Sequence, residues 1–532
     1  MREALVSAGA QAQSESQKNA PHAINRPGLL ESRKAQLVSA AAVFILSLAL
    51  YGWTLAPAVT LVDSGELIAA AHEPGVAHPP GFPLYILLAH LATLIPIGSV
   101  AERVNFASAL FASLAAAALT LTVHEALRAR LRLRQAERKQ KKKKDRGKKH
   151  RETVSYEALD QQPPNGPGPL IALAPGTIAG LMLATSRTHW AYATIAEVYA
   201  LNTLLIIAVF YLMMRWRRER LESIRSDRSL YIAAFVFGLS LGVHHVTAGI
   251  MLPALAALAF SVGGKEIFKS KQLLRAGLAS VAGLSIYVYL PLAASGSPLV
   301  NWGTPDTFER FWWHVTGRQY QDFFSFSLER VFGQLGQFIT LVAREFGPWW
   351  LPLGLLLIIA GAYAVFRRDR RLFWFLALVV LFDLAYALNY EIAEDKDAYY
   401  LPAFVAMAIA AGAGVEWVIA HSRTLKLGSV MVAALLFLVP ATALASSLPF
   451  NDRSRYFIAK DYVENILSTV EPNGMLLTLD WQVYSPLMYF RLVEMLRPDV
   501  VAIDVNHLRR SWYYDYLRRA YPDLIEKNRD KV

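Results

Sequence analysis

The feature that most constrains this 532-residue chain is its series of apolar segments, each about long enough to cross a lipid bilayer as a helix. A bilayer-crossing helix needs about 20 mostly apolar residues. The segments comprise residues 37–58, 104–127, 169–186, 198–214, 229–244, 246–262, 273–293, 348–366, 372–389, 399–420 and 426–447. The chain is therefore predicted to be an all-α polytopic membrane protein with about 11 transmembrane helices.

The net charge of +12 is confined to one stretch of the sequence. Residues 128–151 contain fourteen Lys or Arg and two acids, so the rest of the chain sums to zero. Nucleic-acid binding requires basic residues on a folded face with aromatic residues between them, and this run has no aromatic residue. The run instead favours a solvated loop that orients the protein in the membrane, or a loop that docks to anionic lipid head groups. We expect no nucleic-acid partner.

The orientation follows from the rule that basic loops stay in the cytoplasm. A twelfth apolar stretch, 84–97, is only 14 residues long and lies between prolines. If this stretch does not cross, every basic linker falls on one side, so we expect it to form a re-entrant or interfacial helix on the outer side. The predicted division is a polar cytoplasmic N-terminus (1–36), a transmembrane domain (37–448) with a basic cytoplasmic loop and linker (128–168) and an aromatic outer loop (294–347), and an external domain (449–532).

The external domain is expected to be a small α/β layer. Strand-like segments at 475–479 and 500–505 flank a helical stretch near 484–496. The domain has no Gly-rich phosphate loop, so we expect no nucleotide site there. The chain has no cysteine, which excludes disulfides, zinc–thiolate sites and thiol nucleophiles.

The first outer segment, residues 62–85, places acids directly after a membrane span. Asp63 and Glu66 are three residues apart, so both can lie on one face of a short helix. The following HPPGFP sequence, which includes His78, predicts a non-helical loop. Acids at an apolar boundary are costly and need a reason. Either they serve a functional site, or Asp63 caps the helix.

Two further outer segments carry acids beside aromatic residues. Glu197 and Tyr199 stand at the edge of the fourth span, where an interfacial aromatic belt is the alternative explanation. Asp395 and Lys396 precede the tenth span, where a solvated turn is the alternative. All of these positions fall on the predicted outer face.

Three other features are open to two interpretations. His244 and His245, at the expected tip between spans five and six, can ligate a metal or hold a phosphate, but a lone pair of histidines is a weak zinc signal. The aromatic loop predicts an amphipathic interfacial helix, either a lid over a lipid-linked ligand or a membrane anchor, and its Arg318 can meet a phosphate. Asp383 is an acid within a span, which marks a candidate functional site.

Several motifs together resemble a known family. VDSGELIAAAHEPGVAHPPGFPLY (62–85), AERVNFASALFASLAAA (101–117), AEVYALN (196–202), GVHHVT (242–247) and DKDAYYLP (395–402) carry the resemblance. They are similar to the GT-C glycosyltransferases, which are polytopic enzymes that use polyprenyl-phosphate sugars. The nearest branch comprises uncharacterised bacterial membrane proteins together with animal lumenal protein O-mannosyltransferases. The resemblance covers roughly residues 37–450.

The resemblance implies an inverting hexosyltransferase with its site on the outer or lumenal face. A carboxylate of the first outer loop then serves as general base, which assigns Asp63 and its neighbour Glu66 as catalytic residues. The implied substrate- or donor-binding residues are His78, Glu197, Tyr199, His244, His245, Arg318, Asp395 and Lys396. Glu197 and Asp395 are also the candidate ligands if a divalent metal is needed.

The implied donor is a polyprenyl-phosphate-linked sugar, and mannose is favoured by the animal relatives. The expected partners are membrane lipids, the lipid-linked sugar and a protein or glycan acceptor. A bacterial inner membrane with the site facing the periplasm is the expected location.

A transporter or lipid-carrier flippase is the main alternative function. It predicts polar groups near the midplane of the membrane, broken helices and internal repeats. Asp383 is the only clear midplane acid, and no repeat is visible. A non-catalytic scaffold with a basic lipid tether would leave the acidic outer loops without a purpose. The acids at the outer ends of the spans therefore favour an interfacial enzyme.

Overall fold

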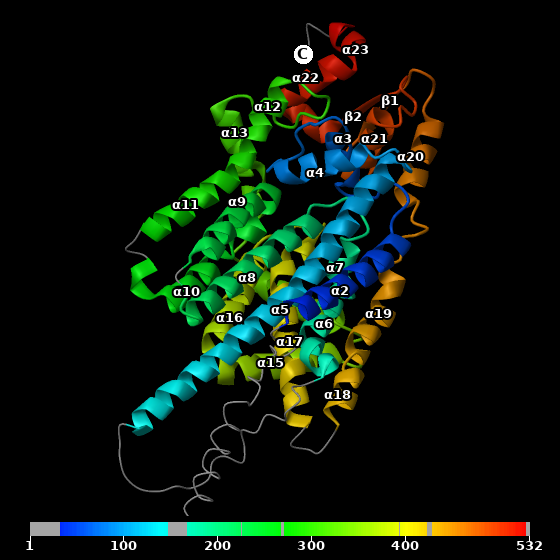
Figure 1. Cartoon of the computed structure of the whole chain (residues 1–532). Helices are drawn as coiled ribbons and strands as arrows, with labels where there is room; N and C mark the ends of the chain where they lie inside the picture. Colours follow the sequence, from blue (N-terminus) through cyan, green and yellow to red (C-terminus); the bar gives the residue numbers. More distant parts are fainter. Residues whose placement is uncertain are drawn as a thin grey trace, which may run out of the picture.

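A computed structural model describes residues 32–146, 168–224, 226–267, 271–392, 394–422 and 428–527. Residues 130–146 and residue 266 are described by their backbone alone. Figure 1 shows a bundle of long helices, with short helices and a small sheet gathered at one end.

The helices of the bundle coincide with the apolar segments. They are α2 (Arg33–Trp53), α5 (Val100–Arg146), α6 (Pro169–Ala184), α8 (Tyr199–Leu221), α9 (Arg228–Gly249), α10 (Leu252–Gly263), α11 (Lys271–Leu284), α15 (Leu353–Arg368), α16 (Arg370–Ala387), α17 (Leu401–Ser422), α18 (Ser429–Leu435) and α19 (Leu438–Asn451). Seven helical stretches in the described part of the chain are long and apolar enough to cross a membrane. The predicted all-α polytopic class is confirmed, and the chain is an integral membrane protein. The number eleven stays a prediction, because α6, α10 and α15 are shorter.

Small residues bring the central helices into close contact. α17 is buried along most of its length and packs against α15 and α6, while α5 packs against α8, α2 and α6. A Cβ atom on Gly361 of α15 would collide with the carbonyl oxygen of Ala410 in α17. Close backbone approach of this kind is typical of helix packing within membranes.

The basic region differs from the expected loop. α5 continues as a helix through Arg146, so residues 128–146 extend it instead of forming a loop. Arg, Lys, Gln and Ala are good helix formers, and neither Gly nor Pro interrupts the run before Gly147. The remainder of the predicted linker, 147–167, and most of the N-terminus, 1–31, lie outside the described residues.

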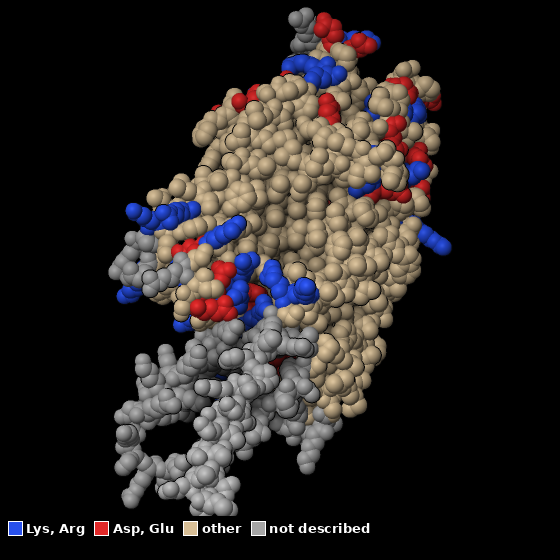
Figure 2. Space-filling model, viewed as in Figure 1, with Lys and Arg blue, Asp and Glu red and all other residues tan. Residues whose placement is uncertain are grey.

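On the face shown in Figure 2, charged side chains gather toward the two ends of the molecule. The basic end of α5 points away from α3 (Ser64–His72) and α4 (Pro83–Thr93), which lie at the opposite end (Figure 1). Figure 2 shows a broad belt without charged side chains between charged groups at either end. α4 has 11 residues, too few to cross a bilayer, as expected for the stretch 84–97.

Several short helices lie at the end of the bundle that carries α3 and α4. α12 (Tyr289–Ser295) ends where the predicted aromatic loop, 294–347, begins. The loop itself forms α13 (Phe308–Val315), η4 (Arg318–Phe323) and α14 (Leu328–Glu345). α13 and α14 are amphipathic, with apolar side chains such as Phe308, Trp312 and Phe332 exposed. The amphipathic helix predicted for the aromatic loop is therefore present in both.

The C-terminal segment combines two short strands with four helices. β1 (Met475–Thr478) and β2 (Val501–Asp504) pair in parallel, with Met475 opposite Val501. The helices are α20 (Ile458–Thr469), α21 (Trp481–Leu492), α22 (Ser511–Ala520) and α23 (Pro522–Lys527). α21 packs directly on α3, so this C-terminal layer joins the membrane domain at the acidic first outer loop.

Candidate active site

A cavity of about 820 Å³ lies at the end of the bundle that carries α3 and α4. Its lining comes from the loop that precedes α4, the start of α8, the C-terminal part of α9, η4, the end of α16 and the C-terminal layer. Parts of the chain far apart in sequence therefore enclose one space, and the predicted site residues can be placed relative to it.

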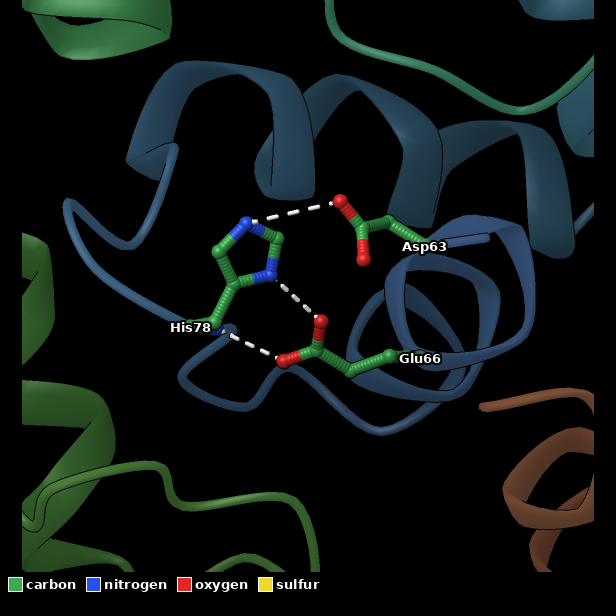
Figure 3. Close-up of side chains that lie close together, drawn as sticks. All are labelled: Asp63, Glu66 and His78. Carbon is green, nitrogen blue, oxygen red and sulfur yellow. Dashed lines mark hydrogen bonds and ion pairs between the residues drawn. The ribbon is translucent and has the colours of Figure 1, made fainter. Parts of the chain in front are cut away.

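The first outer loop supplies three side chains that face one another (Figure 3). Glu66 is fully buried, and its carboxylate accepts hydrogen bonds from the backbone N–H of His78 at 2.7 Å and from His78 Nδ1 at 2.6 Å. His78 Nε2 lies 3.7 Å from Asp63 Oδ2. Asp63 stands at the N-cap position of α3, but its side chain makes no cap hydrogen bond. Capping therefore does not explain Asp63.

The carboxylates keep His78 charged. Burial lowers the pKa of His78, but Glu66, Asp63 and the hydrogen bond to Glu66 outweigh burial and raise the pKa to about 9. His78 is therefore an imidazolium at neutral pH. In this state the His78 ring adds a positive charge to the cavity wall.

Asp63 also belongs to a second cluster, made of carboxylates alone. Carboxylate oxygens of Asp63, Glu197 and Asp395 lie within 4.8 Å of one another. Glu197 is 2% exposed, and its Oε1 has no hydrogen-bond partner. Burial first, and then the neighbouring carboxylates, raise the pKa of both Glu197 and Asp395. Like charges this close need a shared proton or a cation, and an all-oxygen set suits a hard divalent cation.

Tyr192 holds the Asp395 side of this cluster. Its buried hydroxyl lies 3.0 Å from Asp395 Oδ1 and 2.7 Å from Asp397 Oδ1, so its single proton is shared between two carboxylates. Asp395 itself has a left-handed φ of 54°, which is uncommon for a residue other than glycine. Such conformations persist only where the surrounding contacts hold them, and they cluster at functional sites.

The paired histidines also reach the cavity, although not from a loop tip. α9 runs through them to Gly249, and its helix is interrupted at His244. His244 Nδ1 lies 2.8 Å from Thr247 Oγ1, and its ring packs between Tyr199 and Tyr399. His244, His245 and Tyr199 all line the cavity.

Two residues predicted to bind the donor, Lys396 and Arg318, make their contacts outside the cavity. Lys396 Nζ donates hydrogen bonds to the backbone carbonyls of Ala387 and Tyr390. The Arg318 guanidinium stacks on the ring of Trp313, 4.4 Å from its centroid. Neither lines the cavity, and within the described part of the chain no other Lys or Arg does. Among the described residues, the cavity wall is thus rich in carboxylates, and its basic side chains are histidines.

The sequence interpretation missed the C-terminal residues of the cavity. Trp481 Nε1 donates a hydrogen bond to Asp63 Oδ1 at 2.6 Å, and Asp504, Asn506 and His507 line the cavity wall nearby. No local pattern marks these residues, because their role comes from contacts with residues several hundred positions earlier. Asp383, in contrast, accepts a hydrogen bond from the N–H of Ala403 at 3.1 Å and does not line the cavity.

Glu345 binds the start of α7 (Arg187–Ala191), the short helix that precedes Tyr192. Its buried carboxylate should make the stability of the fold depend on pH. The carboxylate accepts hydrogen bonds from the N–H and the hydroxyl of Thr188 in α7. Burial raises the pKa of Glu345 from 4.5 to about 7. The folded state therefore holds this proton more tightly than the unfolded state does. The tighter binding of this proton contributes about 3 kcal/mol to the free energy of unfolding. The contribution is complete below pH 4.5 and is lost as the pH rises through 7.

Glu345→Gln should remove this part of the pH dependence. We expect the thermal unfolding temperature of the wild type to fall between pH 5 and pH 8 more steeply than that of the variant, because a glutamine cannot ionise. Unfolding of both proteins in detergent across this range measures the difference. Equal slopes would contradict the role given to Glu345.

Comparison with known proteins shows what the chain as a whole is similar to. Residues 63–267 match the family model described as the N-terminal domain of protein O-mannosyl-transferase TMEM260. The mouse protein O-mannosyl-transferase TMEM260 is 28% identical over 521 residues, which cover 94% of this chain and 66% of the mouse protein. The corresponding Dictyostelium discoideum protein is 22% identical over 523 residues, covering 90% of this chain and 59% of that protein. The chain thus spans less than two thirds of the length of these relatives.

Solved structures give the same fold. ArnT from Cupriavidus metallidurans bound to undecaprenyl phosphate superposes with a TM-score of 0.52 at 11% identity, covering 89% of this chain and 91% of ArnT. The apo form of ArnT gives a TM-score of 0.50 at 13% identity, covering 92% and 94%. Residues 63–267 are therefore similar to a TMEM260-type N-terminal domain, and the chain as a whole has the membrane fold of ArnT.

Proposed function

We propose that the chain is a glycosyltransferase that moves a sugar, mannose in the first instance, from a polyprenyl-phosphate donor to an acceptor hydroxyl. The observation that carries this proposal is the place of Asp63, which belongs to both charged clusters in one cavity. The relatives named protein O-mannosyl-transferases and the undecaprenyl phosphate bound to ArnT support the sugar and the donor class.

Asp63 is placed to act as the general base. It takes the proton of the acceptor hydroxyl while that oxygen forms a bond to the anomeric carbon of the sugar. The bond from this carbon to the phosphate oxygen breaks at the same time, and polyprenyl phosphate leaves with the electron pair. A single displacement of this kind inverts the anomeric centre.

Glu66 and His78 support this step. Glu66 is fully buried and engaged with His78, so it orients His78 and does not itself reach the acceptor. The charged His78 then provides positive charge near the donor phosphate. His244 and His245 offer further hydrogen-bonding groups on the wall formed by α9.

A divalent cation fits the carboxylate cluster. Glu197 and Asp395, with one oxygen of Asp63, would hold the ion, and the unpartnered Oε1 of Glu197 is available to it. Such an ion would neutralise charge on the donor phosphate. An oxygen-rich site favours Mg²⁺, Mn²⁺ or Ca²⁺ over zinc.

A choice between donors tests the proposed function. The purified chain in liposomes should glycosylate a peptide containing Ser and Thr when it receives polyprenyl-phosphate mannose, but not when it receives a nucleotide-linked mannose. Peptide-bound mannose is measured by mass spectrometry. Transfer from the nucleotide sugar alone would refute the donor class, and movement of the intact lipid-linked sugar across the bilayer would favour a flippase.

The protein acceptor and the location belong to this proposal as well. We place the cavity on the periplasmic or lumenal side, opposite the basic end of α5, with a bacterial inner membrane as the location. The chain lacks cysteine, so single cysteines report on accessibility without background. Glu73 is exposed directly after α3, and Arg371 is exposed at the start of α16, the end of that helix away from the cavity.

Cysteine labelling tests this orientation. In intact cells, Glu73→Cys should react with a membrane-impermeant maleimide, because it lies at the cavity end. Arg371→Cys should react only after permeabilisation. The reverse pattern, measured by gel shift, would overturn the assigned sidedness.

A further inference from the structure

The first residues of α21 contact residues 62–66, the segment that carries Asp63 and Glu66. Trp481 Nε1 donates a hydrogen bond to Asp63 Oδ1 at 2.6 Å. The N–H of Val62 donates to Gln482 Oε1 at 2.8 Å, and the N–H of Glu66 donates to Ser485 Oγ at 3.1 Å. One helix of the C-terminal layer therefore satisfies three polar groups of the turn that carries Asp63 and Glu66.

The contact is close as well as polar. Gly65 lies so near the backbone of Ser485 and Pro486 that a Cβ atom on it would collide with the Ser485 carbonyl oxygen. Ser64, Gly65 and Glu66 are all buried. The two helices are therefore in backbone contact, and a larger residue at position 65 would force them apart.

The turn needs this external support. Val62 has a left-handed φ of 65°, which is unfavourable for a β-branched side chain. Strained residues persist where surrounding contacts hold them. The Gln482 side chain binds the N–H of Val62, and α21 packs on α3 directly behind it.

Gln482 also reaches the other side of the carboxylate cluster. Its Nε2 donates a hydrogen bond to Glu394 Oε1 at 2.6 Å, next to Asp395. One amide side chain thus joins the loop that carries Asp63 to the loop that carries Asp395. We therefore expect the distance between the Asp63 and Asp395 carboxylates to depend on α21.

We propose that α21 is a positioning element of the active site, in which the Trp481 indole N–H fixes the orientation of the Asp63 carboxylate. The TMEM260-type domain at 63–267 is then incomplete without a helix that lies more than 200 residues beyond it. Trp481 occupies Oδ1 of Asp63, and Oδ2 remains directed toward His78. The activity test of this inference rests on the proposed function.

Trp481→Phe removes the indole N–H and keeps an aromatic ring. We expect the kcat for sugar transfer to fall by about 10- to 100-fold with the KM for the donor unchanged within about twofold, because the base is misoriented while the donor site is intact. The control is Trp512→Phe in the same aromatic cluster, where Trp512 packs 5.0 Å from Trp302 and does not line the cavity. This control should retain kcat within about twofold.

Three kinetic results would overturn the proposal. An unchanged kcat in Trp481→Phe would show that the indole N–H has no positioning role. Equal losses in Trp481→Phe and Trp512→Phe would show that the aromatic cluster matters only through packing. A rise in KM alone would also overturn it, because Trp481 would then be a binding residue.

A measurement without turnover separates this inference from the proposed function. In protein labelled with ¹⁵N-tryptophan, the indole signal missing from Trp481→Phe belongs to Trp481. That signal should shift in Asp63→Ala, while the signal missing from Trp512→Phe should stay. An unshifted Trp481 signal would overturn the contact. If the signal shifts in Asp63→Ala but the wild-type protein transfers no sugar, the proposed function is refuted and the contact stands.

Discussion

Asp63→Asn is expected to lower the turnover number for sugar transfer by about 10²–10⁴-fold without unfolding the protein. Asparagine has the shape of aspartate, and its Oδ1 can still accept the hydrogen bond from Trp481. It cannot take the acceptor proton, and it removes a negative charge from both clusters that contain Asp63. Initial rates with polyprenyl-phosphate mannose, together with thermal unfolding of the same samples, measure the effect.

Asp306→Asn is the matched control for this variant. Asp306 lies in the aromatic outer loop, pairs with Arg310 at 3.2 Å and does not line the cavity. The same chemical change there should leave the rate within about twofold of the wild type, since a surface ion pair contributes little. An Asp63→Asn enzyme as fast as the Asp306→Asn enzyme would remove Asp63 as the base.

Removal of divalent cations is the second change with a large expected effect. A chelator should abolish most of the transfer, and Mg²⁺ or Mn²⁺ should restore it. Asp63, Glu197 and Asp395 crowd three carboxylates together, and no Lys or Arg of the described chain lines the cavity to receive a phosphate. Without a cation, an anionic donor would enter a site of its own charge sign.

Glu197→Gln tests which residues hold the cation. The variant should need at least about tenfold more Mn²⁺ for half-maximal rate, because a neutral amide is a poorer ligand than a carboxylate. Glu329→Gln, on the exposed start of α14, is the control and should keep the Mn²⁺ dependence of the wild type. A wild-type enzyme unaffected by chelator would exclude the cation and leave His78 as the main positive charge for the phosphate.

Much of the membrane domain could be predicted because its signals are local. A long apolar segment predicts a helix by itself, and acids beside such segments identified Asp63, Glu197 and Asp395 one at a time. The positive-inside rule then placed all three on one face, and the structure brings their oxygens within 4.8 Å. Their convergence followed from the direction in which each span runs.

Other parts of the site could not be predicted from local patterns. The hydrogen bond from Trp481 to Asp63 joins residues 418 positions apart, and nothing in the sequence around Trp481 marks it. Lys396 looked suited to a phosphate, but its ammonium group is occupied by two backbone carbonyls at the end of α16. The turn expected at His244 is instead a kink within α9, and the helix continues past it to Gly249.

Counting both products of one reaction tests the central claim most directly. The purified chain in liposomes receives polyprenyl-phosphate mannose and an acceptor peptide, and freed polyprenyl phosphate is measured together with peptide-bound mannose. Transfer at Asp63 predicts equal molar amounts of the two products in the wild type and loss of both in Asp63→Asn. Donor that crosses the bilayer intact without glycosylating the peptide, or equal yields from the Asp63→Asn enzyme, would contradict it.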